Sequence, residues 1–432
     1  MPWKDVNVSG DIPVPPELVW SLVRNFCGKW HPAISTMEAE QDKSGRLLRA
    51  FTVHGQDTVY RERLTWFSDS DRSMSYTHVE GIQGVEAYNA QLLVSGNKDG
   101  GARVTMTAKL LAPDPRDEEI ATGTKEIFDQ AIIEIKKLAK FSIPPYVSPK
   151  TNFAHDKPIQ TYAFGDSPRL AISHLGEPSE TLCLFLHGIG GNKSNWNQQL
   201  TSVAPYVQSA ALDLRGYGES TLGAIQSNVD EYCDDILSVA DRLGALNLVL
   251  CGLSYGSWIA TSFAMRYPNR LSALVLSGGC TGMSEALPEE REAFRLSREV
   301  PIRKGKTPAD FSEDLVAVIS GPSVSNTVKR ELLTSMQAIS TETYVDALKC
   351  FTNPLEKFDF SKITMPVLLM TGEHDKLAPP DEIRGVAKRI FETAPEPDVR
   401  FECLAGAGHV CNLENPNAYN SALVEFIMRV VK

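Results

Sequence analysis

Three residues suited to hydrolytic chemistry each follow an apolar run of the sequence, and the first is Ser254. It stands in Gly-Leu-Ser-Tyr-Gly, between the apolar residues 248–250 and a helix-like stretch that ends before Pro268. The order strand, G-x-S-x-G, helix is that of a nucleophile elbow, in which small residues on either side permit a sharp turn that exposes the serine hydroxyl. Without these flanking elements, the five residues would fit an ordinary Gly-Ser turn equally well.

The other two residues are Asp375 and His409. Asp375 ends Thr-Gly-Glu-His-Asp after the apolar run 365–370, and His409 ends Gly-Ala-Gly-His after the run 399–404. A serine hydroxyl is a weak nucleophile until a base takes its proton, so we assign His409 as that base and Asp375 as the group that fixes the imidazole tautomer. Glu373 is the alternative acid, and each residue taken singly also fits a turn or loop role.

Backbone donors for a developing oxyanion are expected next to Ser254. We assign the N–H of Tyr255, directly after the serine, and that of Ile189, in His-Gly-Ile-Gly-Gly after the apolar run 181–186. We expect Trp196 and Trp258 near the mouth of the sheet and consider them for substrate binding, with plain packing as the alternative. The eight cysteines are scattered without a Cys-x-x-Cys pair, and we predict no metal and no cofactor.

Strand-like and helix-like runs alternate from residue 159 to the end of the sequence. This order predicts a mostly parallel sheet with helices on both faces. About eighty residues separate Ser277-Gly-Gly from the strand that begins at Met365, far more than a simple connection needs. This insertion, residues 281–360, has helix-like runs at 288–300, 308–319, 327–339 and 341–350. We predict that it forms a helical cap over Ser254, which excludes water and shapes the pocket.

Together the motifs of residues 159–432 resemble those of the α/β-hydrolase superfamily, in which Ser, Asp and His occur in this chain order. Besides the motifs above, they include Asp213-Leu-Arg-Gly-Tyr-Gly-Glu-Ser and Gly408-His-Val-Cys-Asn-Leu-Glu-Asn-Pro. These two are similar to segments of the group that contains 3-oxoadipate enol-lactonases. The resemblance implies an esterase or lactonase, and related branches include hydrolases of C–C bonds. In the first of these two segments, we expect Arg215 to brace the turn rather than bind substrate.

The N-terminal part of the sequence has a different pattern. A helix is expected at residues 11–26, strands at 47–54, 58–67, 73–79, 86–95 and 102–111, and a long helix at 117–140. The opening Val-Pro-Pro-Glu-Leu-Val-Trp, with Phe26 and Trp30-His-Pro, resembles the SRPBCC superfamily of START, Bet v 1 and polyketide cyclase-like domains. The resemblance implies an α+β helix-grip fold that often holds an apolar ligand. We therefore predict domains at 1–143 and 159–432, joined by a proline-rich linker at 144–158.

Composition limits the remaining possibilities. The chain of 432 residues has a formal charge of -11 and no basic cluster, which argues against a nucleic-acid partner. No apolar run reaches membrane-spanning length and no signal peptide is evident, so we expect a cytoplasmic protein. The oligomeric state cannot be inferred from the sequence.

The sequence therefore predicts a serine hydrolase that cleaves a carboxylic ester or lactone through an acyl-enzyme. Its substrate is expected to be a small apolar molecule, which the N-terminal domain binds or presents. Hydrolysis of a C–C bond in a vinylogous diketone, with the same triad, is one alternative. The other is not enzymatic: an apolar-ligand-binding module joined to a silent hydrolase scaffold.

Overall fold

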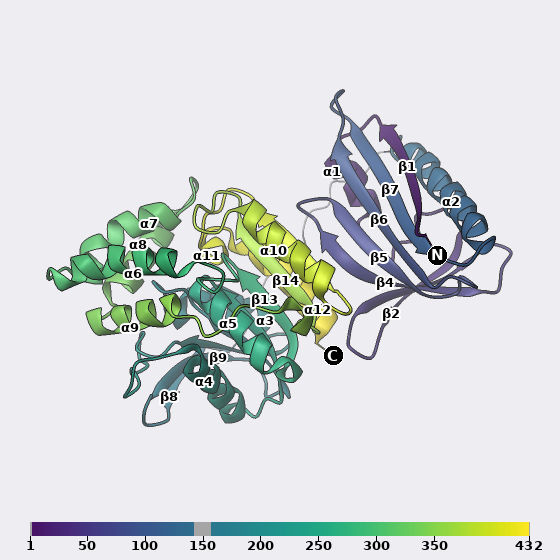
Figure 1. Ribbon diagram of the computed structural model, residues 1–432. Coiled ribbons are helices and arrows are strands. Elements are labelled where there is room, and N and C mark those ends of the chain that lie inside the picture. Colours follow the sequence, from purple (N-terminus) through teal and green to yellow (C-terminus); the bar gives the residue numbers. More distant parts are fainter. Residues whose placement is uncertain (1, 142–156, 432) are drawn as a thin grey trace. The chain divides into compact units, whose positions relative to one another are not determined.

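The computed structural model describes residues 2–141 and 157–431 (Figure 1). Residue contacts divide the chain into two compact units, which are described separately. The predicted linker at 144–158 lies outside the described residues except for its last two positions, so the domain boundaries stay predictions. None of the helices in the described ranges combines the length and the hydropathy needed to span a bilayer.

The first unit is an antiparallel sheet with one long helix. Its strands follow the spatial order β1 (Lys4–Ile12), β7 (Ala102–Leu111), β6 (Ala87–Gly96), β5 (Ser73–Glu80), β4 (Val59–Ser68), β3 (Leu47–Val53) and β2 (Ile34–Gln41). The long helix α2 (Arg116–Leu138) packs on β1 and β7 (Figure 1). Residues of β7 alternate between buried and more exposed positions, as a sheet with one covered face requires. The predicted helix-grip fold is confirmed.

The beginning of this unit differs from the prediction. In place of a helix over residues 11–26, strand β1 extends to Ile12 and helix α1 spans only Pro16–Val23. Val6, Val8 and Ile12 alternate with polar residues and are buried, which is the pattern of a strand with one covered face. Strand β2 was also not predicted, because its sequence is mostly polar and Ile34 is its one buried residue.

The second unit is an α/β sheet. Its strands follow the order β8 (Gln160–Phe164), β9 (Leu170–Leu175), β11 (Gln208–Asp213), β10 (Thr181–Leu186), β12 (Asn247–Leu253), β13 (Leu271–Ser277), β14 (Val367–Gly372) and β15 (Val399–Leu404). The pairs from β11 through β14 are parallel, and β8 and β9 add antiparallel pairs at one edge. The prediction of a mostly parallel sheet is therefore confirmed.

Helices cover this sheet and also fill the insertion. Helices α3 (Asn197–Val203) and α12 (Pro416–Val430) pack together, α4 (Val229–Arg242) packs on α5 (Tyr255–Arg266), and α10 (Pro380–Thr393) packs on β14. Between β13 and β14 lie α6 (Pro288–Arg303), α7 (Ser312–Ile319), α8 (Asn326–Gln337) and α9 (Thr341–Thr352). These four helices gather in one part of the second unit (Figure 1). Helix α6 continues through Pro301, one turn beyond its predicted end.

Candidate active site

Ser254 occupies a strained turn between β12 and α5. Its backbone has φ 56° and ψ -115°, a conformation that residues other than glycine rarely adopt. Its N–H donates to the carbonyl of Ser277 at 2.8 Å, which ties the turn to the end of β13. A Cβ at Gly252 would collide with the backbone of Gly256, and a Cβ at Gly256 would collide with the carbonyl of Leu186. Both glycines are therefore needed for this turn to form.

The structure brings Asp375 and His409 into direct contact. Nδ1 of His409 lies 2.9 Å from Oδ2 and 3.0 Å from Oδ1 of Asp375, and both side chains are buried. Oδ1 of Asp375 also accepts hydrogen bonds from the N–H groups of Leu377 and Ala378, at 2.8 Å and 2.9 Å. A carboxylate held by two backbone donors is fixed in orientation, and it directs the Nδ1 proton of the imidazole toward itself.

Gly278 and Gly279, which directly follow β13, lie close to both Ser254 and His409. A Cβ at Gly279 would lie 4.0 Å from Cα of Ser254, and a Cβ at Gly278 would lie 3.2 Å from Cε1 of His409. The serine turn and the histidine ring thus flank the same two residues. The three predicted catalytic residues follow the carboxyl ends of β12, β14 and β15, the side of an α/β sheet on which ligands bind.

The expected oxyanion donors lie on segments next to Ser254. A Cβ at Gly188 would be 3.3 Å from Cβ and 3.8 Å from Oγ of Ser254, so the loop that carries Ile189 passes beside the serine. The carbonyl of Ser254 accepts bonds from Ser257 and Trp258 in the first turn of α5. Within the described chain, neither the N–H of Tyr255 nor that of Ile189 has a hydrogen-bond acceptor. Both N–H groups are thus unpaired beside the serine.

His187 holds the loop that contains Ile189. Its Nε2 accepts from the N–H of Leu214 at 3.0 Å, so Nδ1 carries the proton and donates to the carbonyl of Gly188 at 2.7 Å. Burial lowers the pKa of His187, which keeps the ring neutral with both nitrogens engaged. This histidine shapes the loop beside the serine and has no nitrogen available for proton transfer.

The turn that follows β11 is supported by a buried ion pair between Lys193 and Asp213. Nζ of Lys193 lies 2.6 Å from Oδ2 of Asp213 and 2.6 Å from Oε2 of Glu219. Arg215 donates through Nε and Nη2 to Asp235 at 2.8 Å and 2.9 Å. The expectation that Arg215 braces its turn agrees with these bonds. The part played by Lys193 was not predicted, because an isolated lysine carries no sequence signal for burial beside a carboxylate.

The alternative acid, Glu373, points elsewhere. Its Oε2 accepts from the N–H of Gly406 at 2.9 Å, and about half of its side chain is exposed. Glu414 has a similar bracing position, since its carboxylate accepts from the N–H groups of Gly321 and Gly408. Asp375 is therefore the carboxylate that contacts His409.

The two tryptophans considered for substrate binding are buried. Trp196 has no exposed surface, stacks on Phe185 with ring centres 4.9 Å apart, and belongs to the core. Trp258 is 1% exposed and donates through Nε1 to Oγ of Ser284 at 3.0 Å. This burial agrees with the alternative of plain packing that was left open for both residues, and their part in substrate binding stays a prediction.

Residues of the insertion reach the loops around Ser254. Met336 of α8 packs directly on Gly190, so a Cβ at that glycine would collide with its methyl group. Phe351 of α9 packs on Tyr255 and Trp258, with ring centres 5.7 Å and 5.5 Å away. The insertion therefore contacts both segments that carry the unpaired N–H groups, as a cap over this site requires.

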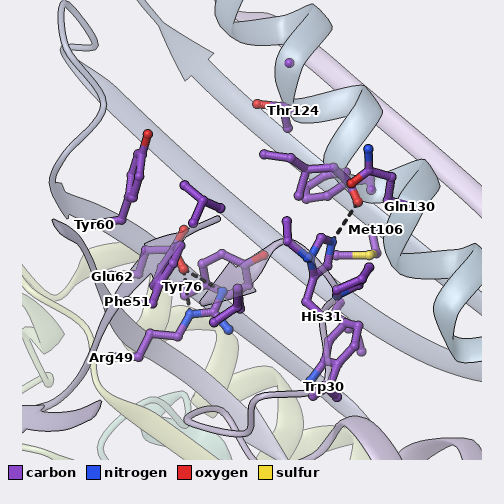
Figure 2. A pocket seen from close by; sticks show the side chains of 18 of the residues that line it. Trp30, His31, Arg49, Phe51, Tyr60, Glu62, Tyr76, Met106, Thr124 and Gln130 are labelled. Carbon is purple, nitrogen blue, oxygen red and sulfur yellow. Dashed lines mark hydrogen bonds and ion pairs between the residues drawn. The ribbon is translucent and has the colours of Figure 1, made fainter. Parts of the chain in front are cut away.

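The first unit contains a separate cavity of about 580 Å³. Figure 2 shows its lining side chains, which come from the strands of the sheet, from helix α2 and from the segment that carries Trp30 and His31. This volume falls within the ~300–1,000 Å³ that is usual for small-molecule sites. In the described parts of the chain, no group of three or more His, Cys, Asp or Glu residues is arranged to hold a metal ion.

Comparison with known proteins matches both units. Residues 177–416 match the sequence profile of the family described as "Serine aminopeptidase, S33", and this match covers more than half of the chain. The chain belongs to this α/β-hydrolase family. Residues 4–140 match the family "Polyketide cyclase / dehydrase and lipid transport". The hydrolase is thus preceded by an SRPBCC domain, as the sequence predicted.

Several relatives of the hydrolase unit are known. The chain is 22% identical to 3-oxoadipate enol-lactonase 2 of Acinetobacter baylyi, over 66% of this chain and 99% of that protein. It is 26% identical to 2-hydroxy-6-oxononadienedioate/2-hydroxy-6-oxononatrienedioate hydrolase of Escherichia coli K12, over 65% of this chain and 98% of that one. A thermophilic esterase from Thermogutta terrifontis is similar in structure, with 25% identity and a TM-score of 0.56, over 65% of this chain and 100% of that one.

Proposed function

We propose that this hydrolase cleaves a carboxylic ester or lactone, with Ser254 as nucleophile, His409 as general base and acid, and Asp375 as the residue that orients His409. The contact between His409 and Asp375, next to a strained serine, carries this proposal. Because Nδ1–H donates to Asp375, Nε2 is left unprotonated and able to accept the serine proton.

The reaction proceeds in two halves. Oγ of Ser254 attacks the carbonyl carbon while Nε2 of His409 takes its proton, and the negative charge on the substrate oxygen is met by the N–H groups of Tyr255 and Ile189. The tetrahedral intermediate collapses when His409 returns the proton to the leaving alcohol, which gives the acyl-serine. Water, deprotonated by His409, then attacks the acyl carbon, and the acid is released while Ser254 regains its proton.

Labelling with a fluorophosphonate tests this proposal. We expect a single adduct in the intact mass of the wild type and none in Ser254→Ala. Ser257→Ala is the matched control, because Ser257 lies three residues further along the chain, in the first turn of α5, and is fully buried. This control is expected to be labelled like the wild type. An adduct that persists in Ser254→Ala, or a folded wild type without an adduct, would contradict the assignment.

The substrate class needs a second experiment, since the relatives include both an enol-lactonase and a hydrolase of a dienedioate or trienedioate. Esters, lactones and vinylogous diketones are tested as substrates of the full chain. We expect the esters or lactones to give the higher kcat/KM. A higher kcat/KM for the diketones would favour the alternative of C–C bond hydrolysis.

Ligand binding by the first unit is a second candidate function, and the cavity of about 580 Å³ is the observation that favours it. We propose that this unit holds an apolar molecule, either as a binding function by itself or to present a substrate to the hydrolase. Titration of the full chain with a small aromatic probe is expected to give saturable binding. A chain that binds a probe but forms no fluorophosphonate adduct would support binding without catalysis.

A further inference from the structure

The cavity of the first unit has an ion pair in its wall. Arg49 on β3 and Glu62 on β4 stand directly opposite each other in the antiparallel register, and both line the cavity (Figure 2). Nε and Nη2 of Arg49 lie 2.6 Å and 2.5 Å from Oε2 of Glu62. These two are the only Arg, Lys, Asp or Glu residues among the described residues that line the cavity, so its wall carries no net charge from such side chains.

Arg49 is held firmly in this position. Its guanidinium lies over the rings of Phe26 and Tyr76, 4.6 Å and 4.5 Å from their centres, and Nη1 donates to the carbonyl of Phe26 at 3.2 Å. Burial raises the pKa of Tyr76 to about 12, so that phenol stays neutral. The cation is therefore neutralised by Glu62 and stacked between aromatic rings, and it is not available as a free anion site.

The second carboxylate oxygen of Glu62, Oε1, is not engaged by Arg49. Both contacts with Arg49 engage Oε2, and no described residue donates a hydrogen bond to Oε1. An ionised carboxylate only accepts hydrogen bonds, so its complement is an O–H or N–H group. His31, which also lines the cavity, has both nitrogens engaged, with Nε2 bonded to the carbonyl of Ile127 and Nδ1 to the N–H of Ala33. Oε1 of Glu62 is thus an unused charged acceptor in this cavity.

Most of the remaining wall is apolar, with side chains such as Val23, Met74, Leu92, Met106, Ile120 and Phe128. We propose that the cavity selects an uncharged, largely apolar ligand whose hydroxyl group donates to Oε1 of Glu62, and that it rejects carboxylates. A carboxylate entering the cavity would lose its hydration beside Glu62 without gaining a free cation. This inference rests on the proposed ligand-binding function of the first unit and is independent of the hydrolase chemistry.

Three aromatic probes of similar size test the inference on the full chain: 2-naphthol, 2-naphthoate and naphthalene. At neutral pH the first carries an uncharged hydroxyl, the second a carboxylate and the third no polar group. In calorimetric titrations we expect naphthol to bind about tenfold more tightly than naphthalene, the usual effect of one hydrogen bond to a charged group. Naphthoate is expected to bind most weakly.

The variant Glu62→Gln removes the negative charge from the cavity wall. It leaves Arg49 without its counter-ion, so naphthoate is expected to bind about tenfold more tightly than to the wild type, and naphthol more weakly. Glu40→Gln is the matched control, because Glu40 also pairs with an arginine of the same sheet but does not line the cavity. If Glu62→Gln does not fold, Glu62→Asp keeps the charge, withdraws the oxygen and is expected to weaken naphthol binding.

Each failure has its own meaning. If no probe binds, the proposed ligand-binding function fails, and this inference fails with it. If naphthoate binds the wild type as tightly as naphthol, ligand binding stands but the selection for an uncharged hydroxyl is wrong. If Glu62→Gln changes only the melting temperature and leaves the order of affinities unchanged, the ion pair is purely structural. The fluorophosphonate experiment is unaffected by all three outcomes.

Discussion

Replacement of Asp375 by Asn probes the proposed triad most sharply, because the structure dictates how the amide would sit. Oδ1 of Asp375 accepts from the N–H groups of Leu377 and Ala378, at 2.8 Å and 2.9 Å. An amide NH₂ cannot take that place, so the amide oxygen is expected to stay there and the NH₂ to occupy the position of Oδ2, 2.9 Å from Nδ1 of His409.

The consequence is a change of tautomer. With a donor facing Nδ1, the imidazole must accept at that nitrogen and carry its proton on Nε2, which then cannot act as the base. Changes of this type lower kcat by about 10⁴, equivalent to about 5.4 kcal/mol of transition-state stabilisation. The free energy of unfolding is expected to change little, because both backbone bonds to residue 375 are kept.

The assay is hydrolysis of a p-nitrophenyl ester by the purified full chain, with the melting temperature measured in parallel. Glu373→Gln is the matched control, because the change is similar and lies two residues away on a side chain that is about half exposed. This control is expected to retain activity within about threefold, since the carboxylate of Glu373 bonds to the N–H of Gly406 and not to His409. The reasoning is refuted if Asp375→Asn stays within tenfold of the wild type, or if Glu373→Gln loses as much.

Three further predictions concern the support of the site. Gly256→Ala places a methyl group against the carbonyl of Leu186 and is expected to lower the free energy of unfolding, measured in urea titrations, by more than about 3 kcal/mol. Gly385→Ala is the control, because its methyl group would lie in open space within α10, and it is expected to raise the free energy of unfolding by up to ~1 kcal/mol. Arg215→Lys keeps the charge but loses the paired bonds to Asp235, and a loss of about 2 kcal/mol is expected in the same titrations; a variant as stable as the wild type would show that the pair contributes little. Burial lowers the pKa of His187 below its ordinary value of 6.5, so the unfolded chain binds this proton at a higher pH than the folded chain does. The melting temperature is therefore expected to fall as the pH decreases below 6.5, and to fall less in His187→Gln.

The strands around the predicted site and the four helices of the insertion were predicted from the sequence, and the physical reason is local. Its strands are buried on both faces and appear as short, uninterrupted apolar runs, such as Thr181–Leu186, between glycine-rich turns. The G-x-S-x-G turn leaves no room for side chains at Gly252 and Gly256, and this requirement for glycine makes the motif recognisable in the sequence. The start of the first unit was harder to predict, because β1 and the edge strand β2 are rich in polar residues, and the prolines before α1 suggested a longer helix.

Contacts between distant residues could not be predicted in the same way. The sequence placed Asp375 and His409 at strand ends, but only the structure shows that Asp375, and not Glu373, contacts the imidazole. The pair of Arg49 and Glu62 gave no signal at all, since charged residues on a strand usually indicate a solvated face. Only the register of β3 and β4, together with the cavity, reveals that this pair lines a ligand-sized cavity.

The ligand preference proposed for the first unit can be compared with the products of the hydrolysis proposed for the second. Hydrolysis of an ester yields a carboxylate and a hydroxyl compound, and hydrolysis of a lactone yields both groups on one molecule. A cavity that accepts a neutral hydroxyl at Glu62 and offers a carboxylate no free cation distinguishes these products by charge alone. It would hold the alcohol or phenol of an ester and leave the acid in solution, whereas the opened form of a lactone would be excluded. The first unit would therefore separate the products of an ester from the product of a lactone, while the choice between these two substrates rests with the second unit and its own assay.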